Sequence, residues 1–178
     1  MGVVLSEYDK KTGYTCGIDG GGKILKVESS NKSVAAVKKS QYCFFLIPKK
    51  LGTTKITVTA LSGKKKIKRS GTVNVVKFQN PFQELKVNNK SYKSKLNASY
   101  NSIKIKTKKA KNKLKIKLKP GWEIDSDSWI MKDYHPTNYT LKNGQKYSLE
   151  KGEELEMLIE VKNKKNGLSI GTHLIIQR

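Results

Sequence analysis

Arginine, histidine and cysteine are scarce in this sequence. Only two of its 37 basic residues, Arg69 and Arg178, are arginines, and it holds two histidines and two cysteines. Arginine is the usual residue for bidentate recognition of phosphate or carboxylate, whereas lysine acts as a hydrated point charge. The sequence shows no zinc-ligand spacing, no nucleophile elbow and no zinc-protease motif. We therefore expect a protein that is not an enzyme and that uses no metal or cofactor.

Long apolar runs are missing as well. The longest, Cys43–Pro48, is far shorter than the roughly 20 residues that a membrane-spanning helix needs. The segment Met1–Ser6 lacks the charged and apolar regions of a secretion signal. If the protein is exported, we expect its signal peptide and any surface anchor to be absent from this sequence.

Positive charge dominates what is present. The formal net charge is +23, with 37 basic against 14 acidic residues. Such a field favours polyanions, among them nucleic acid, anionic glycans, teichoic-type polymers and acidic membrane surfaces. Lysine, asparagine and isoleucine are jointly abundant, which also fits the codon usage of an AT-rich genome. Composition alone leaves both explanations of the charge open.

Apolar residues alternate with polar ones along most of the chain, which is typical of β-strands with one buried face. The expected strands recur about every ten residues, the spacing of a sandwich. They are Tyr14–Ile18, Ile24–Glu28, Val34–Val37, Tyr42–Ile47, Thr54–Ala60, Thr72–Val76, Glu84–Val87, Ser102–Thr107, Lys113–Leu118, Trp129–Lys132, Leu155–Val161 and Leu168–Ile176. Only Glu150–Glu160 competes as a helix, and the apolar alternation at its end favours a strand.

A break at Phe78–Pro81 separates two series of strands, because proline removes a ladder donor and redirects the chain. We predict an all-β fold of two tandem immunoglobulin-like β-sandwich domains, residues 1–78 and 79–178. Asn143-Gly144 and Asn166-Gly167 are turn signals in the second domain, and the latter predicts a hairpin.

Three segments of the first half resemble the bacterial immunoglobulin-like domain of group 2. They are Val27–Val37 (VESSNKSVAAV), Lys49–Thr59 (KKLGTTKITVT) and Gly71–Val75 (GTVNV), and the resemblance covers about residues 20–76. It implies a non-enzymatic repeat of a bacterial surface or secreted protein, and hence an extracellular or cell-surface location. It does not imply a ligand, because the same sandwich serves as a spacer and as a binder. No family motif is recognised in the second half.

The densest charge pattern lies between Ile103 and Lys119. Alternation places isoleucine and leucine on one face and lysine on the other. If the two strands pair as a hairpin, they form a cationic ribbon about 20 Å long. The candidate polyanion-binding residues are Lys104, Lys106, Lys113, Lys115, Lys117 and Lys119. The alternative is a solvated face whose lysines also protect a sheet edge from unwanted pairing.

Two further segments carry basic residues or glycines. Lys64–Arg69 lies between the last two strands of the first domain, and we expect a solvated hairpin loop there. Gly17–Lys23 matches part of a phosphate-binding loop, but Ile24 replaces the required Ser or Thr and a strand follows instead of a helix. We expect a glycine turn.

Carboxylates, aromatics and cysteines offer weaker candidates. Asp125, Asp127, Asp133 and the glutamates between Glu150 and Glu160 lack the spacing of a calcium loop, so we expect solvated carboxylates. Aromatic platforms can stack on sugars or bases, but for the cluster in the second half we expect core positions. Its members are Trp122, Trp129, Tyr134, Tyr139 and Tyr147. Cys16 and Cys43 form either a disulfide or a pair of buried thiols.

The leading hypothesis is a monomeric surface module that contributes adhesion or cell-wall association by binding an anionic polymer or surface glycan through its lysine-rich strands. The alternative is a structural spacer that positions another domain, with its charge set by composition bias. A third reading, nucleic-acid binding, is disfavoured by the shortage of arginine and by the family resemblance. Membrane insertion is not expected.

Overall fold

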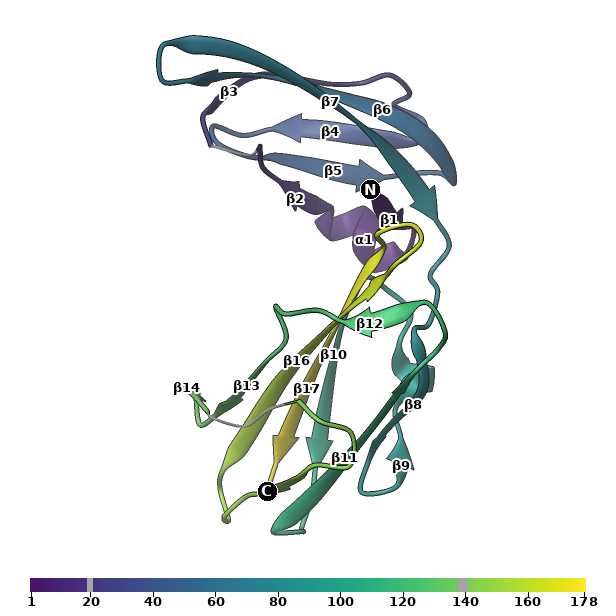
Figure 1. The fold of residues 1–178 in the computed structure, drawn as a ribbon, viewed down its shortest axis with the longest axis vertical. Coiled ribbons are helices and arrows are strands. Elements are labelled where there is room, and N and C mark those ends of the chain that lie inside the picture. The colour runs from purple at the N-terminus through teal and green to yellow at the C-terminus, as the bar shows by residue number, and fades with distance from the viewer. Residues whose placement is uncertain (19–20, 138–140) are drawn as a thin grey trace. The chain divides into compact units, whose positions relative to one another are not determined.

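The computed structural model describes residues 1–18, 21–137 and 141–178, and the chain divides into two compact units, Met1–Phe78 and Gln79–Arg178 (Figure 1). Both units consist almost entirely of β-strands, so the predicted all-β sandwich fold is confirmed. In the described part of the chain, no helix is long and apolar enough to cross a membrane.

The first unit is a sandwich of two sheets. Its elements are β1 (Gly2–Val4), α1 (Glu7–Thr12), β2 (Tyr14–Cys16), β3 (Lys23–Ser29), β4 (Ala35–Lys39), β5 (Phe44–Pro48), β6 (Gly52–Ser62) and β7 (Lys65–Val76). One sheet has the order β1-β7-β6-β3 and the other β2-β5-β4. The first and last strands pair in parallel, and the other pairs are antiparallel. This strand order is that of an immunoglobulin-like sandwich.

Alternating side chains of the two sheets fill the core of the first unit. Ile56 and Val58 of β6 are buried and face the core, while Thr57 between them is half-buried. Phe44 and Leu46 of β5 contribute from the other sheet. The alternation follows from the period of two along a strand, which places every second residue on the same face.

A partly buried polar network links two of the sequence motifs on which the family resemblance rests. Thr54 Oγ1 lies 2.9 Å from Ser29 Oγ and 3.3 Å from Ser30 Oγ, and it accepts a hydrogen bond from the Asn31 N–H at 3.0 Å. Thr54 belongs to β6, whereas the two serines and Asn31 lie at and just beyond the end of β3. The network therefore fixes the turn that follows β3 to the neighbouring strand.

The short helix α1 is not among the predicted elements. Ser6 caps its N-terminus by accepting a hydrogen bond from the Asp9 N–H at 3.0 Å, and its hydroxyl also donates to the Asp9 carboxylate. Gly13 ends the helix with φ of 66°, a conformation that glycine adopts without strain. Six residues are too few to show helical periodicity. The spacing of Ser6 and Asp9, however, is typical of a helix N-terminus and could have indicated α1.

The second unit is also a sandwich. Its strands are β8 (Phe82–Val87), β9 (Lys90–Ser91), β10 (Tyr100–Lys106), β11 (Lys111–Leu118), β12 (Trp122–Ile124), β13 (Trp129–Lys132), β14 (His135–Pro136), β15 (Lys146–Ser148), β16 (Glu154–Asn163) and β17 (Ser169–Gln177), and the 3-10 helix η1 spans Lys93–Lys95. One sheet has the order β10-β17-β16-β13-β14, with β12 also paired to β16, and the other β15-β11-β8-β9. The hairpin predicted at Asn166-Gly167 joins β16 to β17.

The second core is larger and includes two buried tyrosines, Tyr92 and Tyr147. Leu155, Met157 and Ile159 of β16 are fully buried, and Leu114 of β11 contributes from the other sheet. Tyr147 of β15 is also fully buried, as expected for the aromatic cluster. The apolar faces of the two sheets therefore face each other, and their lysine-bearing faces point outward.

Candidate polyanion-binding face

The two lysine-rich strands do not pair with each other, so the condition for a single cationic ribbon, a shared hairpin, is not met. β10 pairs in parallel with β17, whereas β11 pairs with β8 and β15 in the other sheet. Each strand has one apolar face and one lysine face. Placing them in opposite sheets buries both apolar faces in one core.

Lys104 and Lys106 consequently lie on the outer face of the β10 sheet. Lys104 is opposite Ile175 and Lys106 opposite Gln177 in the parallel ladder. The next strand, β16, places glutamates on the same face, with Glu156 opposite Ile175 and Glu154 opposite Gln177. These two lysines therefore share their surface with carboxylates, and they are separated from the lysines of β11.

The outer face of the β11 sheet gathers a larger cationic group. Register places Lys113 opposite Lys146 of β15, and Lys115 opposite Lys86 of β8. We call this group the lysine face: Lys86, Lys113, Lys115, Lys117 and Lys146. Lys119 lies beyond a register shift at the end of β11 and outside this ladder. Lys86 and Lys146 were not predicted, because alternation gives a residue's face but not its partner strand.

The lysines of this face lower the pKa of one carboxylate among them, Glu84. It is opposite Lys117, and its carboxylate accepts a hydrogen bond from Lys86 Nζ at 2.6 Å. That hydrogen bond, together with the positive charges of Lys86, Lys115 and Lys117, lowers the pKa of Glu84 below its ordinary value. Three lysines from two strands thus act on one carboxylate.

Asparagine side chains hold β11 in place on both sides. Asn88 accepts a hydrogen bond from the Lys113 N–H at 3.0 Å and donates to the buried Asn112 at 2.6 Å. On the other edge, Asn143 accepts from the Ile116 N–H at 2.9 Å, and the Gly144 N–H donates to Leu114 O at 2.8 Å. The predicted Asn143-Gly144 turn therefore holds the lysine-bearing strand β11 at its β15 side.

The remaining sequence candidates have mixed outcomes. Lys64–Arg69 is not a loop, because β7 begins at Lys65. Part of Gly17–Lys23 lies outside the described residues, and the strand β3 follows it as expected. Cys16 and Cys43 are free thiols. Burial raises the pKa of Cys16, and the nearby Cys43 raises it further. Among the described residues, no group of three ligand-forming side chains could hold a metal ion.

The aromatic cluster is only partly in the core. Trp122 and Trp129 are half-buried, and Trp129 contacts the His173 ring edge-on at 5.7 Å between centroids on the outer face of the β16 sheet. Tyr134 is 76% exposed and Trp129 lies on the outer face, so the expected core position is wrong for both residues. Tyr139 lies outside the described residues.

Comparison with known proteins finds only distant structural likenesses. No family model matches the sequence, and no curated protein matches it. The fibronectin(III)-like modules of Clostridium thermocellum CbhA are 12% identical with a TM-score of 0.31, over 88% of this chain and 80% of that chain. A chimeric titin Z1Z2 functionalized with a decorin peptide is 10% identical with a TM-score of 0.29, over 100% and 92% of the chains.

Human protocadherin-24 EC1-2 is 14% identical with a TM-score of 0.28, over 99% and 94% of the chains. Likenesses at this level carry no inference about function. The immunoglobulin-like assignment rests on the strand order of each unit.

Proposed function

We propose that this chain is a non-catalytic module of a bacterial cell-surface or secreted protein that binds an anionic polymer through the lysine face. The motifs at Val27–Val37 and Lys49–Thr59, which resemble group 2 bacterial immunoglobulin-like domains, support the location. The observation that carries the binding proposal is the direct opposition of Lys113 to Lys146 and of Lys115 to Lys86.

Opposed lysines are unfavourable in the free protein and favourable in a complex. Like charges directly opposite each other destabilise a sheet. Lysines two residues apart lie about 7 Å from each other along a strand, and neighbouring strands are about 4.8 Å apart. These spacings are shorter than the Debye length of about 8 Å at physiological salt, so the fields of neighbouring lysines overlap. A linear chain of phosphate, sulfate or carboxylate groups lying along β11 would relieve the repulsion.

Lysine side chains are also suited to binding a polymer whose anionic groups repeat along the chain but are not held in one orientation. The lysine ammonium group is a hydrated point charge, whereas specific readers of a single phosphate use the planar fork of arginine. The strands that carry the lysine face, β8, β11 and β15, contain no arginine. This composition favours a surface polymer such as a teichoic acid or an anionic glycan over a sequence-specific nucleic-acid site.

Matched charge removal tests the proposal. Lys113/Lys115/Lys117→Gln removes three charges from the lysine face, and Lys104/Lys106/Lys162→Gln removes three from the outer face of the other sheet. Both variants and the unchanged chain are titrated with teichoic acid, a heparin-like glycan and duplex DNA at about 50 and 200 mM salt, because salt screens non-specific attraction. We expect the first variant to bind the preferred polymer about tenfold more weakly, since each exposed contact is worth up to about 1 kcal/mol. The control variant should bind nearly as the unchanged chain does.

Equal losses in both variants would reject the lysine face as a site. Weak binding to all three polymers that disappears at the higher salt would instead favour a spacer whose charge follows from composition. Strongest binding to duplex DNA would favour the nucleic-acid reading.

A further inference from the structure

A second group of lysines lies in the first unit, on the sheet that contains β3, β6 and β7. A hollow of about 440 Å³ opens at the surface of this sheet. It is lined by Leu25, Lys26, Thr59, Lys66, Ile67 and Lys68. The lysines among them come from the two strands on either side of β6. Positive charge therefore borders the hollow on two sides.

Strand register explains the hollow. Lys26 of β3 and Lys68 of β7 are both opposite Thr59 of β6, one from each side. The backbones of β3 and β7 are separated by two strand spacings, roughly 10 Å. The short threonine side chain does not fill this interval, and the longer lysine side chains form its two walls. Because lysine has a flexible four-carbon stem, both ammonium groups can reach an anion placed above Thr59.

A β-bulge adds further positive charge to the same face. The register between β3 and β6 shifts between Ile24 and Lys26, because Leu25 is an extra residue there. Without this residue, the period of two would place Lys23 and Lys26 on opposite faces. With it, both lysines are exposed, while Ile24 is buried in the core. β3 and β7 therefore each present two lysines beside β6. We call these four residues the cationic groove: Lys23, Lys26, Lys66 and Lys68.

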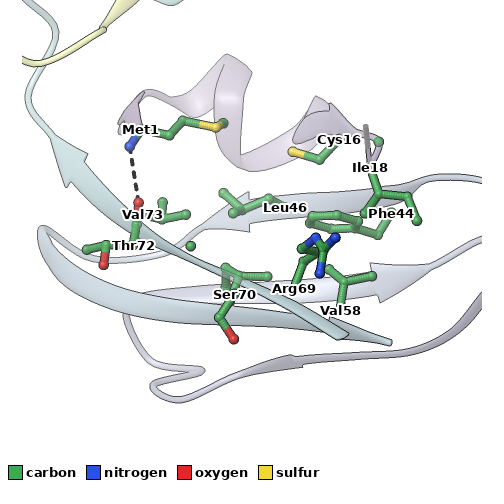
Figure 2. Close-up of a pocket in the computed structure, with 13 residues that line it drawn as sticks. Met1, Cys16, Ile18, Phe44, Leu46, Val58, Arg69, Ser70, Thr72 and Val73 are labelled. Atoms are coloured by element: carbon green, nitrogen blue, oxygen red, sulfur yellow. Dashed lines mark hydrogen bonds between the residues drawn. The ribbon is translucent and has the colours of Figure 1, made fainter. Parts of the chain in front are cut away.

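The two faces of β7 have different surroundings. Figure 2 shows Arg69 on the core side, at a cavity of about 390 Å³ between the two sheets, whereas Ser70 points to the opposite side. Gly71 lines the same cavity. Lys66 and Lys68 share the outward face of Ser70, because they precede it by four and two residues. The charge of Arg69 is therefore separate from the cationic groove.

Glu28, the next outward residue of β3, shows that the lysines of the groove act together on an anion. Its carboxylate lies 2.8 Å from Lys26 Nζ. The hydrogen bond from Lys26, together with the charges of Lys26, Lys68 and Lys32, lowers the pKa of Glu28. Lys26 belongs to β3 and Lys68 to β7, so both walls of the groove act on this one carboxylate.

We propose that the cationic groove binds phosphate or sulfate groups of an anionic polymer, as a second site besides the lysine face. Of the residues that the structure describes, none forms a salt bridge with Lys23, Lys66 or Lys68, so these charges are free to pair with a ligand. The choice of polymer rests on the function proposed above, whereas the site rests on the groove itself. Each unit of the chain then holds the polymer at one place, which raises the affinity for long polymers above that for short ones.

Protection of lysines from acetylation locates the bound polymer residue by residue. The full chain is acetylated with and without teichoic acid or a heparin-like glycan at about 150 mM salt, where long-range attraction is screened. Mass spectrometry measures the rate of modification at each lysine. At a polymer concentration of about twice the dissociation constant, we expect acetylation of Lys26, Lys66 and Lys68 to slow about threefold. Lys38 and Lys49, exposed lysines at the other sheet of this unit, should react at an unchanged rate.

Two triple variants with the same loss of charge compare the groove with the other sheet of the first unit. They are Lys26/Lys66/Lys68→Gln in the groove and Lys38/Lys49/Lys50→Gln as the control. We expect the groove variant to bind a polymer of about 40 repeating units at least tenfold more weakly, because one of two linked sites is lost. An oligomer of about six units should lose less, since the lysine face alone can hold it. The control variant should bind nearly as the unchanged chain does.

Removal of the acid beside the groove should have the opposite effect. Glu28→Gln removes the carboxylate that competes with the polymer for Lys26 and Lys68. We expect binding at least about twofold stronger, as for the removal of one exposed charge contact. Glu7→Gln is the matched control, because it raises the net charge equally and its ion pair with Lys10 lies in α1. That variant should bind as the unchanged chain does.

Three results would overturn the proposal. The first is protection confined to the lysine face, which would keep the function proposed above and reject the groove. The second is equal weakening by the two triple variants, which would show attraction to total charge alone. The third is equal strengthening by Glu28→Gln and Glu7→Gln. Protection of the groove without the lysine face would instead support this site and reject the function proposed for the lysine face.

Discussion

Lys113 and Lys146 lie directly opposite each other in the ladder between β11 and β15, on the outer face of the second sandwich. Strand pairing normally places opposite charges or uncharged groups in this relationship, since opposed like charges are destabilising. The repulsion between Lys113 and Lys146 should therefore lower the stability of the free protein, whether or not a ligand binds.

Lys146→Glu should stabilise the free protein while weakening its binding to an anionic polymer. The new carboxylate faces Lys113, and cross-strand charge pairs of this kind contribute roughly 0.2–1 kcal/mol. Urea unfolding measures the free energy of unfolding. Lys162→Glu is the control, because Lys162 is opposite Glu123 and the same change there should destabilise. A stability change of the same sign in both variants would contradict the cross-strand explanation.

Glu84 should contribute to stability at neutral pH and lose that contribution in acid. Its hydrogen bond from Lys86 and the nearby lysine charges hold its pKa below the ordinary value of 4.5. A carboxyl whose pKa is lower in the folded state stabilises above the unfolded pKa, and this stabilisation is lost as the pH falls through the folded pKa. Glu84→Gln should therefore lower the thermal midpoint at pH 7 and converge with the unchanged protein in acid. Parallel pH curves for the two proteins would count against this assignment.

Glu160 should behave in the opposite way. Burial raises its pKa, the hydrogen bond from Ser169 opposes this, and the charges of Asp125 and Asp127 raise it further. A carboxyl whose pKa is raised by folding favours the folded state at low pH, and this advantage is lost as the pH rises through the folded pKa. Glu160→Gln should thus raise the thermal midpoint at pH 7, where glutamine can still accept from Ser169. The difference should vanish below about pH 4, near the ordinary carboxyl pKa.

The cap of α1 gives a fourth prediction. Ser6→Ala removes the acceptor of the Asp9 N–H and should lower the free energy of unfolding of the first unit by about 1 kcal/mol. Ser6→Thr retains a capping hydroxyl and should cost much less. Hydrogen exchange of residues 7–12 localises the effect, and exchange unchanged by Ser6→Ala would show that the cap does not hold the helix.

Long strands could be predicted from the sequence because their alternation persists over many residues. The expected strands at Thr54–Ala60 and Leu155–Val161 lie within β6 and β16. The three-residue strands β1 and β15 were not predicted, because so short a segment shows no periodicity. They form where longer strands offer free edges, which is a property of the folded chain.

The sequence could not determine which strands pair with each other at the site. The alternation of β10 and β11 fits a shared hairpin and opposite sheets equally well, so the lysines were assigned to one ribbon. Lys86 and Lys146 joined the lysine face only through register. Gly71 likewise did not indicate a cavity in the sequence. Whether the space beside a glycine stays empty depends on which side chains of the facing strands reach it.

The parallel ladders also determine how each unit responds to force. In the first unit, tension applied between Met1 and Phe78 would pull the parallel strands β1 and β7 past each other along their length. The hydrogen bonds cross this direction at a steep angle, so they are loaded together instead of opening one after another. β10 and β17 form a parallel ladder of seven residue pairs in the second unit, and a pull that separates Tyr100 from Arg178 would load it in the same way. Each ladder would therefore resist such a pull with several hydrogen bonds at once.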